Sequence, residues 1–266
     1  MFHSIRKLFA PSEETPPPAV PEGQRVYAIG DIHGRLDLFA ALVNAIETDD
    51  TEARPAETTV VLLGDLVDRG PDSAGVLKLA RDWQCRRTVR ILAGNHEEMF
   101  LRSFDDLQLF RHFLRHGGKE TVLSFGVGRT QFTNASLEEA QALMVGAVSE
   151  DDRAFVESFE DVVTIGDYAF VHAGIEPGVP LEEQKRAQLR WIREPFLSHM
   201  ASHGPVIVHG HTITAAPEDH GNRIAIDTGA FMSGRLTALV LEGSVRRYLV
   251  ATADEAGAIT AAAYVA

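Results

Sequence analysis

Apolar and β-branched residues gather into three short runs in the amino-terminal part of the chain, and each run is followed by glycine. The runs occupy residues 26–29, 58–63 and 89–93. A short apolar run bounded by turn residues is typical of a buried strand. Apolar residues recur at helical spacing between the runs, over residues 36–46 and 74–80. Strands that alternate with helices form βαβ units, so this part predicts an α/β fold with a parallel sheet.

The pattern changes over residues 97–160, where strand signals are few. Helical spacing covers residues 99–114, 120–125 and 137–148. We expect a helical insert here that lies over the carboxyl edge of the sheet and shapes access to it.

Strand patterns return at residue 161. Residues 161–165 and 168–171 flank Gly166-Asp167, a two-residue connection typical of a β-hairpin. Further strands are expected at residues 206–208, 223–226, 236–241 and 245–250, and we place the last three in a second sheet.

Composition at the two ends limits the predicted domain to the middle of the chain. Residues 1–24 hold five prolines, which favours a flexible Pro-rich segment. A short amphipathic helix built on Phe2, Ile5, Leu8 and Phe9 is the alternative, although so short a helix is unstable alone. We therefore expect one domain over residues 25–253 and a carboxyl-terminal tail over residues 254–266.

Charge and composition narrow the possible partners. The chain has 25 Lys and Arg against 38 Asp and Glu, a formal charge of −13, which repels nucleic acid and anionic membranes at long range. No apolar run is long enough to span a membrane or to act as a secretory signal, so we expect a cytoplasmic protein. Cys85 is the single cysteine, which excludes an internal disulfide.

Polar residues follow the predicted strands at the edge where open α/β sheets bind their ligands. Carboxylate, imidazole and amide groups without thiolate suit Mn²⁺, Fe or Zn²⁺. Two ions need a shared anionic bridge, and Asp65 follows the central strand of the three. The candidate ligands are Asp31, His33, Asp65, Asn95, His172 and His211.

Each of these residues also has a structural interpretation. A lone Asp or His at a strand end is more often a cap or a hydrogen-bonded core group than a ligand. Asp68 and Arg69 could form an ion pair only, and we interpret His209 as a core histidine. The metal hypothesis depends on several such motifs occurring together and in order.

Five motifs together resemble the metallophosphoesterase (calcineurin-like) superfamily and, within it, the bacterial branch of the phosphoprotein phosphatase (PPP) family. They are GDIHG at 30–34, GDLVDRG at 64–70, GNHE at 94–97, HAG at 172–174 and GHT at 210–212. The resemblance implies a two-sheet β-sandwich flanked by helices, with a dinuclear site. It implies that Asp31 and His33 hold one ion, that Asp65 bridges, and that Asn95, His172 and His211 hold the other.

The same resemblance implies roles in catalysis. His96 would be the general acid, Asp68 its orienting partner, and Arg69 a phosphate ligand. Arg193, in Trp191-Ile192-Arg193, would be a second phosphate clamp, with Arg190 as the competing candidate.

These roles imply a metal-dependent phosphomonoesterase, most similar to serine/threonine protein phosphatases, with tyrosine phosphate also possible as a substrate. A metal-bound hydroxide would attack phosphorus in line, with two divalent ions, Mn²⁺ first and Fe or Zn²⁺ next. The substrate would be a phosphorylated protein or a small phosphoester, not nucleic acid. No oligomeric state is predicted.

Two alternatives stay open. Symmetrical dinucleoside tetraphosphate hydrolases share most of these motifs, but usually show Asn where this chain has Asp68 and Asp where it has Glu97. Ala93 stands where eukaryotic protein phosphatases carry arginine, which leaves specificity for protein substrates open. Ile213 stands where nuclease-like relatives carry a second histidine, which favours the PPP branch. A non-catalytic metal- or phosphate-binding signalling module is disfavoured because all six ligands and His96 are present.

Overall fold

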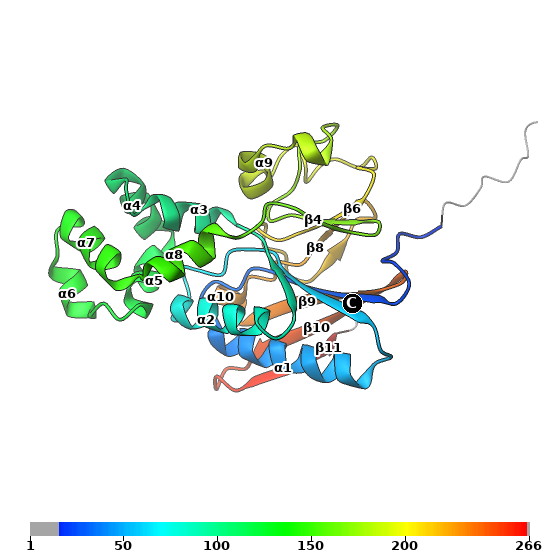
Figure 1. Ribbon diagram of the computed structural model, residues 1–266, viewed down its shortest axis with the longest axis horizontal. Helices are drawn as coiled ribbons and strands as arrows, with labels where there is room; N and C mark the ends of the chain where they lie inside the picture. Colours follow the sequence, from blue (N-terminus) through cyan, green and yellow to red (C-terminus); the bar gives the residue numbers. More distant parts are fainter. Residues whose placement is uncertain (1–15, 265–266) are drawn as a thin grey trace, which may run out of the picture.

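Two sheets form the centre of the protein in the computed structural model, which describes residues 16–264 (Figure 1). The first sheet has six strands in the order β11-β10-β9-β1-β2-β3. The central strands β1, β2 and β3 run parallel, as the sequence predicts. The strands of this sheet are β1 (Gln24–Ile29), β2 (Glu57–Leu62), β3 (Thr88–Ile91), β9 (Arg235–Glu242), β10 (Val245–Ala253) and β11 (Ile259–Tyr264).

The second sheet has five strands in the order β4-β5-β6-β8-β7. Its hairpin, β4 to β5, is antiparallel and turns at Gly166-Asp167 as predicted. The strands are β4 (Val163–Ile165), β5 (Tyr168–Phe170), β6 (Val206–His209), β7 (Glu218–Asp219) and β8 (Arg223–Ala225).

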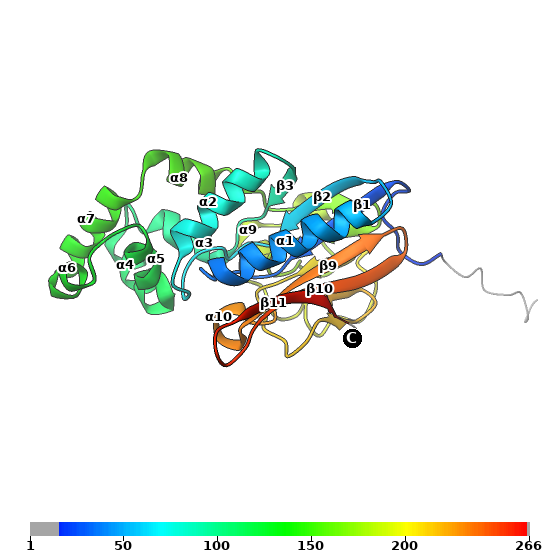
Figure 2. The ribbon, with the colours of Figure 1, turned by 90° about the horizontal axis from the view of Figure 1, so that it is seen from below.

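Alternate residues of the central strands face the two halves of the core. Tyr27 and Ile29 point toward the helices α1 (Leu36–Glu52) and α2 (Ser73–Gln84), in one apolar cluster. Val26 and Ala28 point the other way and pack with residues of the second sheet. Period-two alternation thus makes β1 a wall between a helical layer and a sheet layer. This arrangement confirms the predicted two-sheet β-sandwich flanked by helices (Figure 2).

Helices occupy most of residues 95–157 and project to one side of the sheets (Figure 1). The single predicted pattern over 99–114 is wrong at its centre, because two helices form there. The chain leaves the first helix after Arg102, and Asp106 caps the second by accepting from the backbone N–H of Gln108 and Leu109. The helices are α3 (Asn95–Arg102), α4 (Leu107–Phe113), the π-helical turn η1 (Leu114–Gly118), α5 (Lys119–Ser124), α6 (Arg129–Asn134), α7 (Leu137–Ala147) and α8 (Glu150–Glu157).

Sheet membership at the carboxyl end differs from the sequence prediction. Strands β9 and β10 were expected in the second sheet, but β9 pairs antiparallel with β1 in the first. The expected tail over residues 254–266 is also a correction, because β11 pairs with β10 over Ile259–Tyr264. The alanine-rich sequence of β11 lacks the β-branched run that predicts a strand.

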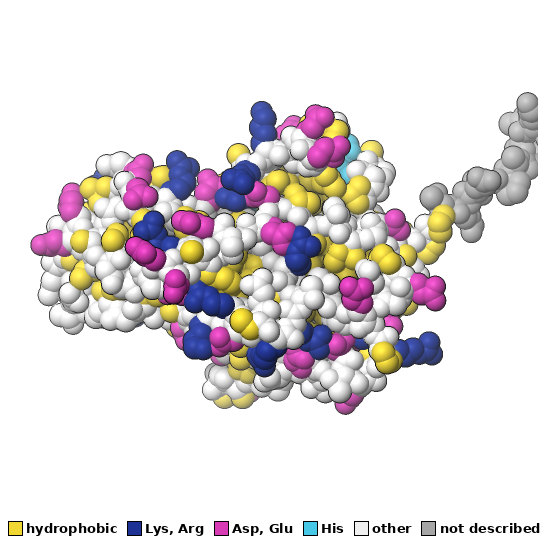
Figure 3. Space-filling model, viewed as in Figure 1, with side chains coloured by type: hydrophobic (Ala, Val, Ile, Leu, Met, Phe, Trp, Pro, Cys, Tyr) yellow, Lys and Arg dark blue, Asp and Glu magenta, His cyan; other side chains and the backbone are white. Residues whose placement is uncertain are grey.

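The amino-terminal segment joins the domain earlier than residue 25. Val20 is buried and its backbone N–H donates to Gly243 O at 3.0 Å. The flexible segment and the amphipathic alternative fall mainly on residues 1–15, which lie outside the described residues. Across the described part of the chain, every helix is too short or too polar to cross a bilayer. Acidic, basic and apolar side chains intermingle over the face drawn in Figure 3.

Candidate metal centre

The parallel strands β1, β2 and β3 bring their carboxyl ends to one edge of the first sheet. Asp31 and His33 follow β1, Asp65 follows β2, and Asn95 and His96 begin α3 after β3. All five residues are buried. The second sheet adds His172 after β5 and His211 after β6. The predicted meeting of strand ends therefore places these residues in one region.

The backbone at this edge is unusual. Among the described residues, five that are not glycine have positive φ, and all five belong to the motifs. This conformation is unfavourable for residues with a Cβ and persists only where the surrounding structure imposes it. The residues are His33, Asp65, Asp68, Arg69 and His211, with φ between 47° and 74°.

Close backbone packing explains two of the motif glycines. A Cβ on Gly70 would lie 2.0 Å from His33 O, and one on Gly64 would lie 2.7 Å from Gly94 N. Only glycine allows these loops to approach so closely. The spacing between the first three motifs is thus held by direct backbone contact.

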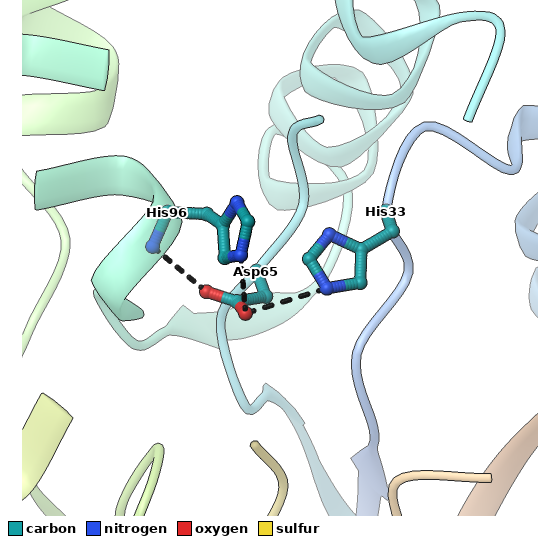
Figure 4. A group of neighbouring side chains, drawn as sticks. All are labelled: His33, Asp65 and His96. Carbon is teal, nitrogen blue, oxygen red and sulfur yellow. Dashed lines mark hydrogen bonds and ion pairs between the residues drawn. The ribbon is translucent and has the colours of Figure 1, made fainter. Parts of the chain in front are cut away.

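Asp65 lies at the centre of the cluster and is shared by two groups of possible metal ligands. One group is Asp65 with His33 and His96, and the other is Asp65 with His172 and His211. Asp65 Oδ2 lies 3.4 Å from His33 Nε2, and Asp65 Oδ1 lies 3.4 Å from His172 Nε2. Figure 4 shows the first group, in which both imidazole rings turn toward the carboxylate.

The protons of the two nearest histidines point away from Asp65. Nδ1 of His33 donates to Val67 O at 2.7 Å, and Nδ1 of His172 donates to Leu63 O at 2.8 Å. In the neutral ring the Nε2 atom then carries a lone pair, and this lone pair faces an anionic carboxylate. Lone pairs that face a carboxylate fit a bound cation between them, and the guanidinium of Arg69 also reaches the lone pair of His33 at 2.8 Å.

The pKa values of these histidines agree with this interpretation. Burial lowers the pKa of His33 well below its usual value and lowers that of His172, although Asp65 opposes both shifts. Burial and the charge of His172 lower the pKa of His211 to about 3. A ligating imidazole must be neutral, so all three rings are in the required state near neutral pH.

Asn95 joins His172 to His211. Its Oδ1 atom lies 3.0 Å from His172 Nε2 and 2.9 Å from His211 Nδ1. His211 Nε2 is buried and has no hydrogen-bond partner among the described residues. The amide oxygen and the two rings thus form a compact set of neutral donors beside the carboxylate of Asp65.

Asp31 is buried, but it lies outside the two groups centred on Asp65. Its carboxylate accepts from the backbone N–H of His211 at 3.1 Å. Burial, followed by the charges of Asp227 and Asp65, raises the pKa of Asp31 well above its usual value. A divalent cation would offset this concentration of negative charge.

Sequence reasoning missed Asp227, which follows β8 and is buried beside Asp31. Burial raises the pKa of Asp227 to about 6, while the backbone N–H of Gly229 donates to its carboxylate at 2.9 Å. The only signal was an Asp after an apolar run, which by itself predicts a cap.

His96 and Asp68 form a buried pair. His96 Nδ1 donates to Asp68 Oδ2 at 2.6 Å, which leaves Nε2 to face the cluster. Burial would lower the pKa of His96, but the charges of Asp65 and Asp68 outweigh it and raise the pKa. The ring is therefore oriented and biased toward the imidazolium form.

Helix α5 supports this pair through a residue that sequence reasoning missed. Thr121 Oγ1 donates to Asp68 Oδ1 at 2.6 Å and accepts from the backbone N–H of Asp68 at 2.8 Å. Ser73 Oγ also accepts from this N–H, at 3.0 Å. The helices of residues 95–157 thus contribute directly to the position of Asp68.

The guanidinium of Arg69 bridges two histidines. It donates to His33 Nε2 at 2.8 Å, and it lies 2.9 Å from His96 Nε2. Its other face lies 4.6 Å from the ring centre of Phe231, which also packs edge-on against His33. Arg69 is therefore a positive group held at the cluster, where a phosphate could reach it.

Arg193 and Arg190 occupy different environments. Arg190 forms ion pairs with Asp161 at 2.7 Å and Glu98 at 3.5 Å. Arg193 is exposed, has no ion pair among residues 16–264, and its charge acts on the pKa of His211. The arrangement leaves Arg193 available to an anion at the cluster, whereas Arg190 is neutralised by carboxylates.

Glu97 fixes the loop that carries Asp65. Its carboxylate accepts from the backbone N–H of Asp65, Leu66 and Gly94 at 2.8 Å each, and of Val67 at 3.3 Å.

His209, interpreted as a core histidine, is fully buried against Phe196.

The chain is similar in sequence to several known proteins. The family described as calcineurin-like phosphoesterase matches residues 24–232. Serine/threonine-protein phosphatase 1 of Salmonella typhimurium strain LT2 is 28% identical over 222 residues, covering 80% of this chain and 90% of that protein. The asymmetrical bis(5'-nucleosyl)-tetraphosphatase PrpE of Bacillus velezensis is 28% identical over 233 residues, covering 79% of this chain and 86% of that protein.

Among solved structures, a crystal structure provisionally described as that of a diadenosine tetraphosphatase aligns with a TM-score of 0.60 at 20% identity. The alignment covers 94% of this chain and 99% of that one. At this identity the likeness establishes the fold.

Proposed function

Because this chain belongs to the calcineurin-like phosphoesterase family, we propose that it is a metal-dependent phosphomonoesterase, acting as a serine/threonine protein phosphatase that also accepts phosphotyrosine. One observation carries the proposal: Asp65 is shared by two groups of buried candidate ligands, one of which contains the oriented His96. A shared carboxylate is the feature that two-ion phosphoester hydrolysis requires. The relative in Salmonella is named as a serine/threonine-protein phosphatase, which supports the substrate class.

The family uses divalent metals, and the donor set fits two such ions. We propose that Asp31, His33 and Asp65 hold one ion, and that Asp65, Asn95, His172 and His211 hold the other. Nitrogen and oxygen donors without thiolate favour Mn²⁺, with Fe or Zn²⁺ next. When bound, the two ions supply Lewis acidity and lower the pKa of a bound water toward neutrality, which provides a nucleophile.

The protein's own residues would bind the phosphate and move the proton. Arg69 and Arg193 would hold the phosphoryl oxygens and neutralise their charge. His96 would donate its Nε2 proton to the departing alkoxide, with Asp68 stabilising the imidazolium. Direct displacement needs no phosphorylated side chain.

Dinucleoside tetraphosphate hydrolysis is the second candidate. The relative in Bacillus velezensis, named as an asymmetrical tetraphosphatase, covers about as much of this chain at the same identity as the phosphatase does. Asp68 and Glu97 favour the phosphomonoesterase over the symmetrical hydrolases described above. We propose a cytoplasmic setting for either activity.

Turnover with Mn²⁺ of a phosphoserine peptide, a phosphotyrosine peptide, p-nitrophenyl phosphate and diadenosine tetraphosphate tests the proposal. The expected result is the highest kcat/KM on the phosphoserine peptide among the biological substrates. A clear preference for diadenosine tetraphosphate would replace the first candidate with the second. Absence of hydrolysis of all four, in protein shown to hold metal, would refute both.

A further inference from the structure

The junction of α4 and η1 carries a group of exposed arginine and histidine side chains, on the turn that contacts Arg69 of the candidate metal centre. Residues three and four apart share one helix face, so four exposed residues line up along it. We call this set the basic face, and it consists of Arg111, His112, Arg115 and His116.

Backbone contacts fix the basic face against Arg69. The backbone N–H of Arg69 donates to Gly117 O at 3.1 Å. A Cβ on Gly117 would lie 2.7 Å from both the nitrogen and the Cγ of Arg69, and Gly117 has φ of 104°. The turn that follows His116 therefore packs on the residue proposed to bind the scissile phosphate.

The charges that act on the basic face are positive. The His112 and His116 rings lie 4.1 Å apart, with His116 Nδ1 bonded to His112 O at 2.8 Å. Burial and then the charges of His116, Arg115 and His96 lower the pKa of His112. Because His96 acts on His112, the basic face lies within electrostatic reach of the catalytic pair. A bound anion would relieve this repulsion.

Three carboxylates on neighbouring elements have partners outside the basic face. Glu98 pairs with Arg102 and Arg190, and Glu120 pairs with Arg129. Asp106 caps the opposite end of α4. Neither arginine of the basic face forms an ion pair within residues 16–264. In a chain of net charge −13, a positive group left unpaired beside the site is a local reversal of the overall field.

We propose that the basic face is a subsite for a second anionic group of the substrate, a carboxylate or a phosphate next to the scissile phosphate. The proposal rests on the phosphoesterase function and narrows its substrate: acidic residues flanking a phosphoserine, or the remaining phosphates of a polyphosphate chain, would lie on Arg111 and Arg115. Because the two arginines are exposed, the subsite contributes to selectivity and not to the chemical step.

The test compares two phosphoserine peptides that differ only in flanking Glu or Gln, together with p-nitrophenyl phosphate, on the Mn²⁺-loaded full chain. Exposed ion pairs are weak, so Arg111→Gln/Arg115→Gln should lower the ratio of kcat/KM between acidic and neutral peptides by about 2- to 20-fold, through KM. Arg111→Lys/Arg115→Lys should restore most of the ratio. Arg86→Gln, which removes an exposed cation outside the basic face that forms no ion pair within residues 16–264, is the matched control and should leave the ratio unchanged.

A second arm identifies the source of the anion. Calorimetric binding of inorganic tripolyphosphate should weaken in the double Gln variant relative to inorganic phosphate if polyphosphate uses the subsite. An effect on the acidic peptide alone identifies carboxylates as the ligand.

The subsite would be overturned if the double Gln variant kept both the peptide ratio and the binding of tripolyphosphate. It would also be overturned by an equal loss of kcat/KM on all substrates that the double Lys variant does not restore. If the wild type still hydrolyses p-nitrophenyl phosphate, either outcome removes the subsite and leaves the proposed function intact. Failure of the wild type to hydrolyse any phosphoester removes the function and the subsite together.

Discussion

His96 Nδ1 donates to Asp68 Oδ2 at 2.6 Å, and both side chains are buried. This bond orients the ring so that Nε2 points toward Asp65 and Arg69. It also raises the pKa of His96 against the effect of burial. The pair therefore has the geometry and the charge of an oriented general acid.

Replacement of His96 by Asn tests this role through the leaving group. A serine alkoxide needs a proton to depart, whereas p-nitrophenolate does not, so phosphoserine turnover should fall by about 10²–10⁴-fold and p-nitrophenyl phosphate turnover much less. Because the pKa of His96 is raised, the protonated form persists above the usual value of about 6.5, and wild-type kcat on phosphoserine should decline only above it. Stopped assays across a range of pH measure both the loss of turnover in the variant and the pH dependence of kcat in the wild type. Equal losses on both substrates, with metal content unchanged, would mean that His96 is not the proton donor.

Removal of the shared charge of Asp65 should weaken both proposed ion sites. Asp65→Asn keeps the shape of the side chain but loses the anion that two groups of ligands share. Metal content by mass spectrometry after dialysis should fall well below two ions per chain. Asp105→Asn, on an exposed residue outside the cluster, is the control and should match the wild type. Two ions kept at normal affinity by Asp65→Asn would contradict a bridging role.

Thr121 should matter to both stability and turnover. Thr121→Val removes the hydroxyl that bonds Asp68 Oδ1 and leaves buried polar groups unpaired, which costs about 1–3 kcal/mol of unfolding free energy. Phosphoserine turnover should also fall, because Asp68 loses a contact that positions it for His96. Urea denaturation and steady-state kinetics measure the two effects, and Thr121→Ser, which keeps the hydroxyl, should recover most of both. Wild-type stability and turnover in the Val variant would show that Asp68 is positioned without Thr121.

Carboxylates of α1 at the far end of the first sheet should make stability sensitive to acid. Burial would raise the pKa of Glu47, Asp49 and Asp50, but hydrogen bonds from arginines and other donors outweigh it and lower all three. A depressed folded pKa stabilises the protein above the unfolded value of roughly 4, and this stability is lost as pH falls through the folded pKa. The urea midpoint of the wild type should therefore drop below about pH 4.

Asp50→Asn isolates one member of this cluster, since Asp50 bonds the buried Arg25 at 2.7 Å and Arg87 at 2.8 Å. At pH 7 the variant should lose about 1–3 kcal/mol of unfolding free energy, and its difference from the wild type should narrow in acid. Asp82→Asn, in the exposed pair with Lys78, should change little at either pH. A difference that stayed constant into acid would refute the linkage.

Local sequence determined the elements that position the site. Apolar runs followed by glycine predicted β1, β2 and β3, and parallel pairing brings their carboxyl ends together wherever such strands are adjacent. This is why Asp65, which follows the central strand, could be predicted to lie between the histidines. The hairpin at Gly166-Asp167 was equally local, because two residues fix its turn.

Tertiary structure decided which distant segments meet. Strand β9 could have paired in either sheet, since its interior positions are all buried and its apolar run does not mark one face, and the structure pairs it with β1 in the first. Thr121 contacts Asp68 across 53 positions of the chain. Phe231, which follows the last strand of the second sheet in the sequence, packs against Arg69. Periodicity reports which face of an element is buried, but not which partner covers it. The residues that support and complete the site therefore became visible only once the chain was folded.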